Sequence, residues 1–473
     1  MWNSLLPSRR KLGRRAAALL IVAAVVGLPA VALRATCAGN SCRSTAEASS
    51  NTPFCSLPSD LRKLIEHGYY DGRAPDIIAV TGRTLVGGGD AFQVPGPKPL
   101  WPTTSENDGG RVPIVFSGSG LAPSADVPAK TRLDAVAETL ADVIGLSREH
   151  PEVRSGEAIA GLASGETPRL VLQVVLKGIR SEDLEQHPSA WPVLRHLMGS
   201  GAGTLDGMVG SLPLDPAASL ATIGTGGLPY QHGTTGSLLR RDEAGVSRAE
   251  GKGFEAKVVT AWSKTAPRSV IATLGDDLDQ TLKQRPIIGL VGTDPIDRGL
   301  IGGNWYVGGD RDRVVILDQK TPPVEQAGRT AELLRSQGFG KDQIPDLVGV
   351  VLSGRLDELD ASLSRLIRAA RTASGGSFTT LVTATGRAGP PENATVMASE
   401  KLAAQLGARI DVEGSLIEAL ALGGVYLDQQ QLARFKLSDD IVLQELLRLR
   451  TADGERVMAD AFPSIAITFG RYC

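Results

Sequence analysis

Apolar residues occur along the chain in short continuous runs, which are separated by stretches of helical periodicity. Runs rich in Val, Ile and Leu are typical of strands that are buried on both faces. The alternation of strands and helices predicts an α/β fold with a mainly parallel central sheet covered by helices on both faces. The predicted strands are residues 77–80, 113–116, 170–176, 287–291, 347–351 and 380–383.

Between these runs, apolar side chains recur at spacings of three and four residues, which places them on one face of a helix. The longest such patterns cover residues 133–144 and 356–370. Shorter patterns predict helices around Leu402 and Leu406, and around Leu416, Ile417 and Leu420.

The N-terminus combines a basic cluster with an uncharged apolar segment. Residues 1–15 carry five cations, and residues 16–33 carry no charge. A cationic flank stays in the cytoplasm while the apolar run enters the bilayer, and this run is close to the ~20 residues that span one. We expect either a single-pass transmembrane anchor at residues 16–33 or a signal segment that is cleaved. In both cases the rest of the chain lies outside the cytoplasm, at the cell membrane or secreted, after a small, polar linker at residues 34–52.

The four cysteines support an oxidising compartment. Cys37, Cys42 and Cys55 follow the apolar segment and Cys473 is the last residue of the sequence. An even number of cysteines whose spacing resembles no zinc motif suits disulfide bonds, and four cysteines allow three pairings.

Charge and composition exclude one class of partner. The formal net charge is -2 and the aromatic content is 4%. A nucleic-acid-binding protein usually carries a basic surface or aromatic stacking platforms. We therefore expect no nucleic-acid partner, and we expect the membrane to be contacted through residues 16–33.

Residues 211–234 read SLPLDPAASLATIGTGGLPYQHGT. This stretch resembles the nucleophile segment of the alkaline phosphatase superfamily, especially its type I phosphodiesterase and nucleotide pyrophosphatase branch. Upstream, the predicted strand 170–176 leads into Lys177-Gly-Ile-Arg180, where that family has Asp-Gly-(Leu/Ile/Met)-Arg. Downstream, residues 346–371 and 378–386 are similar to the helix and strand before the family's Asp-His-Gly motif.

A second resemblance lies out of order. Residues 111–120 and 134–146 are similar to the C-terminal part of the superfamily, although here they precede the strand that normally opens the fold. The resemblance implies a circularly permuted alkaline-phosphatase-like sandwich, in which residues 53–160 complete the sheet begun by residues 161–473. The alternative is two separate half-domains. Permutation brings the ends of a domain together, and so it implies that Cys55 pairs with Cys473 and Cys37 with Cys42.

Members of the superfamily use two divalent metals such as zinc, held by Asp and His, and a Thr or Ser that attacks phosphorus. At the matching positions this chain has Lys177 in place of the first aspartate and Pro216 at the nucleophile. Ser219 is the nearest hydroxyl, with helix packing or backbone bonding as its simpler role. Thr385 lies in the segment that matches the Asp-His-Gly motif. We therefore expect no catalytic residue, no metal site and no cofactor.

The leading hypothesis is an exported, membrane-anchored relative that has lost catalysis and acts as a binding or scaffold module of the cell envelope. Its partner would be an envelope protein or an anionic ligand. Lys177, Thr225 and His232 would form the anion-binding pocket, with Lys177 supplying the charge of a metal ion.

Two alternatives remain. A phosphodiesterase or phosphatase with a rearranged metal site would need acidic residues such as Asp215, Asp294 and Asp297 to cluster. The simpler interpretation of such aspartates is that they cap turns and helices. A purely structural envelope protein is the third hypothesis.

Overall fold

The structure, a computed structural model, describes residues 53–81, 84–86, 110–241, 257–303, 305–306, 311–387 and 395–473. The expected membrane segment at residues 16–33, the linker at residues 34–52, and both Cys37 and Cys42 lie outside these ranges. Within them, none of the helices combines the length and the apolar character that a membrane span requires.

A seven-stranded sheet forms the centre of the described chain. Five neighbouring strands (β11, β4, β10, β8 and β9) run parallel, and β3 is antiparallel to both β11 and β5. The prediction of a mainly parallel sheet is therefore confirmed. The strands, in spatial order, are β5 (Ala202–Met208), β3 (Arg111–Gly118), β11 (Phe378–Ala384), β4 (Leu170–Leu176), β10 (Asp346–Leu352), β8 (Ile288–Gly292) and β9 (Arg313–Ile316).

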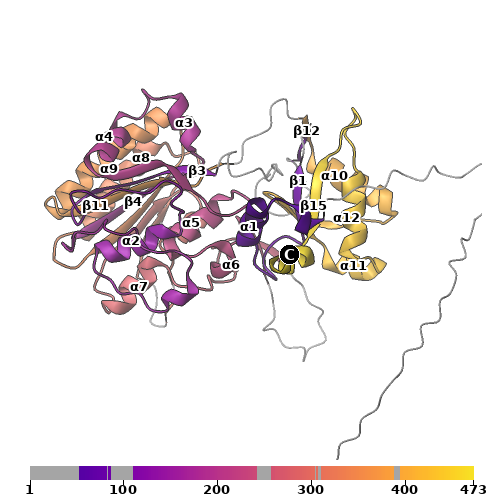
Figure 1. The fold of residues 1–473 in the computed structure, drawn as a ribbon, viewed down its shortest axis with the longest axis horizontal. Coiled ribbons are helices and arrows are strands. Elements are labelled where there is room, and N and C mark those ends of the chain that lie inside the picture. The colour runs from indigo at the N-terminus through magenta and orange to yellow at the C-terminus, as the bar shows by residue number, and fades with distance from the viewer. Residues whose placement is uncertain are drawn as a thin grey trace, which may run out of the picture. The chain divides into compact units, whose positions relative to one another are not determined.

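Helices cover both faces of this sheet (Figure 1). Every residue of β4, β10 and β11 is buried, as the continuous apolar runs predicted. One face is covered by α3 (Ser181–Gln186), α4 (Pro192–Ser200), α8 (Pro323–Gln337) and α9 (Leu356–Ser374). The other is covered by α2 (Ala135–Val143), α5 (Pro216–Thr225), α7 (Leu274–Thr281) and the 3-10 helix η4 (Pro295–Leu300).

Strand β3 is the element on which the expected permutation depends. It lies inside the central sheet, between β11 and β5, and pairs Ile114 with Thr383. Residues 111–118 thus belong to the same sheet as residues 170–176 and 378–384. Whether this chain order arose by permutation stays a prediction.

A buried ionic cluster attaches the segment after β3 to α7. Arg148 lies 2.7 Å from both Glu138 and Asp277, and Arg154 lies 3.0 Å from Asp277. The Tyr306 hydroxyl donates to the other Asp277 oxygen at 2.8 Å. Because these charges are paired and hydrogen-bonded, their burial is tolerated.

A second, antiparallel sheet has a hydrophobic core of its own, which the sequence did not predict. Its strands are β13 (Ile417–Ala421), β14 (Gly424–Leu427), β1 (Ile77–Thr81) and β15 (Met458–Pro463). Side chains of α10 (Ser399–Ile410), α11 (Gln429–Phe435) and α12 (Asp439–Arg448) belong to the same core. Side chains on β1 alternate between two cores, since Ile77 belongs to this core and Ile78 to that of the central sheet.

Two predictions are corrected here. The run at residues 77–80 is a strand, but it pairs antiparallel with β14 and β15 and lies outside the parallel sheet. The pattern at Leu416, Ile417 and Leu420 is not a helix, because Ile417–Ala421 forms a hairpin with β14. A short apolar run fits either structure by its spacing, and tertiary pairing decides between them.

The remaining short elements connect these parts. They are α1 (Ser59–Gly68), α6 (Pro229–His232), α13 (Ser464–Thr468) and the ladders β2 (Thr84–Val86) with β12 (Thr395–Met397) and β6 (Leu238–Arg241) with β7 (Lys257–Thr260).

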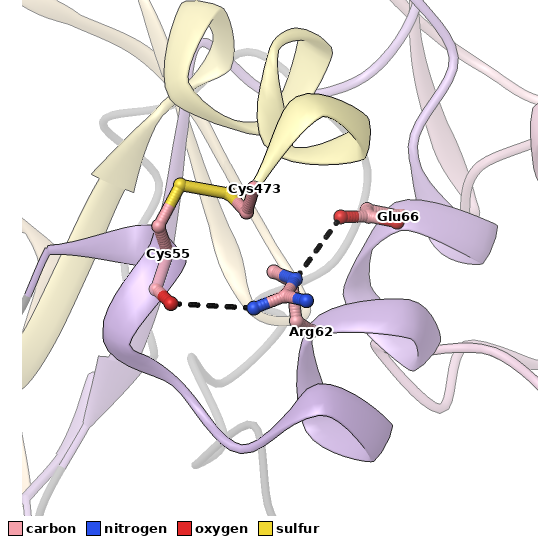
Figure 2. Close-up of a disulfide and its surroundings, with 4 residues drawn as sticks. All are labelled: Cys55, Arg62, Glu66 and Cys473. Carbon is pink, nitrogen blue, oxygen red and sulfur yellow. Dashed lines mark hydrogen bonds and ion pairs between the residues drawn. A yellow bond between two sulfur atoms is a disulfide. The ribbon is translucent and has the colours of Figure 1, made fainter.

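Cys55 and Cys473 form a disulfide bond, with their Cα atoms 5.3 Å apart (Figure 2). Arg62 of α1 lies beside it, donates to the Cys55 carbonyl at 3.3 Å and reaches Glu66 at 3.7 Å. The expected pairing of Cys55 with Cys473 is confirmed. Cross-links across long loops constrain the unfolded chain most, by about 4–5 kcal/mol in the chain-entropy account.

Candidate functional site

The carboxyl ends of β4, β8, β10 and β11 meet at one edge of the central sheet, because these strands are parallel. Ligands of open α/β sheets bind at such edges. The backbone ladder continues past the strands: the Lys177 N–H donates to Leu352 at 2.8 Å, and the Thr385 N–H donates to Leu176 at 3.2 Å. We call the group of Lys177, Ser219, Asp297 and Thr385 the carboxyl edge. It contains the positions where the resemblance placed metal ligands and the nucleophile.

Lys177 is paired with a buried carboxylate. Its Nζ lies 2.7 Å from Oδ1 of Asp297, whose side chain is 0% exposed, while the Lys177 side chain keeps 16% exposure. The ammonium group is therefore committed to neutralising a carboxylate within the protein. Burial raises the pKa of Asp297, and the positive charge of Lys177 opposes that rise.

Asp297 is held from its other side by the backbone of η4. Its Oδ2 accepts hydrogen bonds from the N–H groups of Thr293 at 2.8 Å and Asp294 at 3.0 Å. Gly292, at the end of β8, allows this approach, since a Cβ there would lie 2.5 Å from Oδ2. Asp294 caps η4 by accepting from the Ile296 N–H. The interpretation of these aspartates as turn and cap residues is confirmed by this geometry.

The nucleophile position falls at the start of α5. Pro216 is the first residue of the helix, where a missing N–H leaves no bond unmade. Asp215 is the N-cap: its Oδ1 accepts from the Ala217 N–H at 2.9 Å and from the Ser237 hydroxyl at 2.7 Å. Ser219 is buried and donates to the Thr385 carbonyl at 3.0 Å. Ser219, the nearest hydroxyl along the sequence, thus bonds the backbone, which was its simpler predicted role.

Thr385 connects the ends of two neighbouring strands. Its hydroxyl accepts from the Gly178 N–H at 2.8 Å and lies 3.0 Å from the Gly386 carbonyl. The side chain is fully buried. The Thr385 side chain therefore joins the ends of β11 and β4 through backbone hydrogen bonds.

Thr225 and His232 serve the turn after α5. The Thr225 hydroxyl bonds the Ala221 carbonyl at 2.6 Å and the Gly227 N–H at 3.2 Å. His232 accepts from the Thr234 N–H through Nδ1 at 3.0 Å, so that Nε2 carries the proton and faces the Thr222 hydroxyl at 3.1 Å. Burial lowers the pKa of His232 to about 3, which keeps the ring neutral.

The prediction that Lys177, Thr225 and His232 form an anion-binding pocket is therefore corrected. The ammonium group of Lys177 pairs with Asp297. The Thr225 hydroxyl bonds the Ala221 carbonyl, and the His232 ring accepts from the Thr234 N–H. A ligand anion would have to displace the internal carboxylate, so we do not propose a site there.

The residues present do not fit a two-metal centre. In the part of the chain that the structure describes, no group of three or more His, Cys, Asp and Glu side chains is placed to hold a metal ion. The hydrolase alternative required Asp215, Asp294 and Asp297 to cluster. Asp294 and Asp297 bond the backbone of one turn, residues 293–296, and Asp215 caps α5.

Comparisons with known proteins give a distant structural similarity. No protein-family model and no curated protein matches this chain. A crystal structure of wild-type alkaline phosphatase PafA is similar at a TM-score of 0.42 and 15% identity, over 60% of this chain and 77% of that one. A mutant of the same enzyme gives a TM-score of 0.42 and 14% identity, over 59% and 76%. Similarity at this level carries no inference, and the proposals below rest on the residues of this chain.

The partner of Asp297 was not predicted from the sequence. Asp297 was considered for an acidic cluster or a turn, and the structure makes it the partner of Lys177. The local sequence Asp294-Pro-Ile-Asp297 indicates a cap. Nothing in that signal identifies a lysine 120 positions earlier as the partner.

Proposed function

We propose that this protein is a non-catalytic, phosphatase-like binding module of the cell envelope, held at the membrane by residues 16–33. The observation that carries the proposal is the Lys177–Asp297 pair, an internal salt bridge at the carboxyl ends of the parallel strands. A dication at this edge would need anionic or neutral ligands. An ammonium group at the first ligand position repels it.

The hydroxyl groups support the same conclusion. A nucleophile of this kind needs an activating base or metal and free access to phosphorus. Pro216 has no hydroxyl, and Ser219 donates its proton to a backbone carbonyl inside the fold. No step of phosphoryl transfer can be written through these side chains.

The test is made on the purified full-length chain. Elemental analysis measures bound metal, and chromogenic phosphate mono- and diesters measure hydrolysis with added Zn²⁺, Mn²⁺ or Ca²⁺. We expect a folded protein without stoichiometric metal and without turnover above buffer. Stoichiometric metal together with metal-dependent turnover would overturn the proposal in favour of a hydrolase with a rearranged site. Turnover that Ser219→Ala abolishes would identify the residue responsible.

A further inference from the structure

A groove of about 640 Å³ lies between α4 and α9, near the amino end of β11 and away from the carboxyl edge. We call it the α4/α9 groove. Arg368 and Arg371 of α9 and His196 of α4 line it, together with the hydroxyl groups of Ser117, Ser364 and Thr380. No Asp or Glu lines it. Cationic and hydroxyl groups around a concave surface are the donors that an oxyanion requires.

Thr380 provides an independent observation. It lies on β11, is 1% exposed, and its hydroxyl has no hydrogen-bond partner among the described residues. Its neighbours on the same strand are bonded, since Thr379 donates to the Ser119 carbonyl and Thr383 donates to the Pro113 carbonyl. A buried hydroxyl without a partner costs free energy. A ligand oxygen in the groove that Thr380 lines would supply the missing acceptor.

A second groove, of about 870 Å³, lies on the other side of α9, against α8. Arg335, Lys341, Arg365 and Arg368 line this α8/α9 groove, so that Arg368 belongs to both grooves. Its one acidic residue, Glu332, pairs with Arg329 at 3.2 Å. Across the two grooves, five Lys and Arg side chains have no ion pair within the described residues, although the net charge of the whole chain is -2.

Helix dipoles account for only part of this arrangement. Arg371 and Arg335 lie in the last turns of α9 and α8, where a cation is favoured. The dipole effect falls off within one turn, and it explains neither Arg365 and Arg368 nor the unpartnered Thr380 hydroxyl. The five cations are exposed to solvent, and the buried, unpartnered Thr380 hydroxyl beside them is the feature that points to a ligand.

We propose that the α4/α9 groove binds a tetrahedral oxyanion, phosphate in the first instance, between Arg368, Arg371 and Thr380. The α8/α9 groove binds a second anionic group of the same ligand, with Arg368 between the two. The ligand class is therefore a molecule that carries two or more phosphate groups, either a small oligophosphate or an anionic polymer. This inference rests on the proposed function as a binding module and names the chemistry of what the module binds.

The experiment uses the full-length protein and a series of one chemistry: inorganic phosphate, pyrophosphate, tripolyphosphate and long-chain polyphosphate. Calorimetric titration at low ionic strength measures each affinity. Two connected subsites predict that affinity rises from phosphate to tripolyphosphate and weakens with added salt. A further gain with the long chain indicates a polymer as the natural source, whereas a plateau at tripolyphosphate indicates a small ligand; both results support the site.

Variants locate the binding. Arg368→Gln removes the cation shared by both grooves and is expected to weaken tripolyphosphate binding about tenfold or more. Arg355→Gln is the matched control, because this exposed arginine precedes α9 and neither it nor its partner Asp357 lines a groove, and we expect a change within about twofold. Thr380→Val removes only the unpartnered hydroxyl and is expected to weaken phosphate binding about threefold.

Three results would overturn the proposal: no measurable binding of any member of the series, equal losses in Arg368→Gln and Arg355→Gln, or an affinity that Thr380→Val and Arg368→Gln both leave unchanged. Circular dichroism of each variant shows that it is folded. Release of free phosphate during the titration is measured separately. Binding together with release of free phosphate would overturn the non-catalytic function and keep the site. If neither binding nor phosphate release is observed, the site is overturned and the non-catalytic function stands.

Discussion

The carboxyl edge and the α4/α9 groove differ in how their polar groups are satisfied, although β11 contributes to both. At the carboxyl edge, Lys177 is paired with Asp297 and the Thr385 hydroxyl bonds the Gly178 N–H. In the groove, Arg368 has no carboxylate partner and the Thr380 hydroxyl has no partner at all among the described residues.

This difference indicates that the polar groups of the carboxyl edge stabilise the fold, whereas those of the α4/α9 groove are available to bind a ligand. Polar groups that satisfy one another inside the fold contribute to holding it together, and a ligand would have to break those bonds in order to bind. The buried Thr380 hydroxyl costs free energy until a ligand supplies the missing partner, and the exposed guanidinium of Arg368 is accessible to an anion. The carboxyl edge is therefore structural, and the strongest candidate for binding lies near the other end of β11.

The largest effect is expected from breaking the buried pair. Lys177→Met leaves Asp297 buried without a counter-charge, and we expect a loss of about 4 kcal/mol in the free energy of unfolding at pH 7. Urea denaturation followed by circular dichroism measures it. In the double variant Lys177→Met/Asp297→Asn no charge remains buried, so most of the loss should be recovered. A single variant as stable as the wild type would show that the pair does not hold this edge.

The next effect is a dependence on pH that comes from His232. Its folded-state pKa of about 3 lies below the ordinary value of 6.5. Stability from the neutral ring is therefore present above pH 6.5 and is lost as the pH falls toward 3. Between pH 7 and pH 4.5 the wild type should lose about 3 kcal/mol relative to His232→Gln, which does not titrate.

The comparison with His232→Gln is needed because other groups act in the opposite direction. Burial raises the pKa of Asp312 to about 7 and those of Asp279 and Asp346 to about 6. These carboxyl groups favour the folded state as the pH falls, and they are common to both proteins. Parallel curves of unfolding free energy against pH for the two proteins would contradict the assignment to His232.

The smallest effects on stability are expected when Thr385 and Thr380 are each replaced by valine. Thr385→Val leaves the half-buried Gly178 N–H without its acceptor, and we expect a loss of about 1 kcal/mol in stability. Thr380→Val removes a buried hydroxyl that has no partner among the described residues, so stability should rise by about 1 kcal/mol in the absence of ligand. Thermal and urea unfolding of the two variants measure the contrast. Equal losses would mean that the Thr380 hydroxyl is satisfied within the fold.

Much of the fold could be predicted from local patterns. The runs at residues 170–176 and 347–351 are buried central strands because their side chains are apolar on both faces. The Leu416–Leu420 pattern failed for the same reason that the longer patterns succeeded: five residues are too few to distinguish a helical period from a strand. At the candidate site the sequence showed only which residue types are absent: position 177 is not Asp, and position 216 has no hydroxyl.

The sequence by itself determined the α/β class and the strands β3, β4, β8, β10 and β11 of the central sheet, and it did not predict β5 or β9. The class and the predicted strands follow from residue type and short-range spacing. Only the tertiary structure decided that Asp297 neutralises Lys177, that Arg148 and Arg154 enclose Asp277, and that Thr380 is buried without a partner. Such pairings join residues far apart in the chain, and packing sets their distance and burial. No local pattern encodes that geometry.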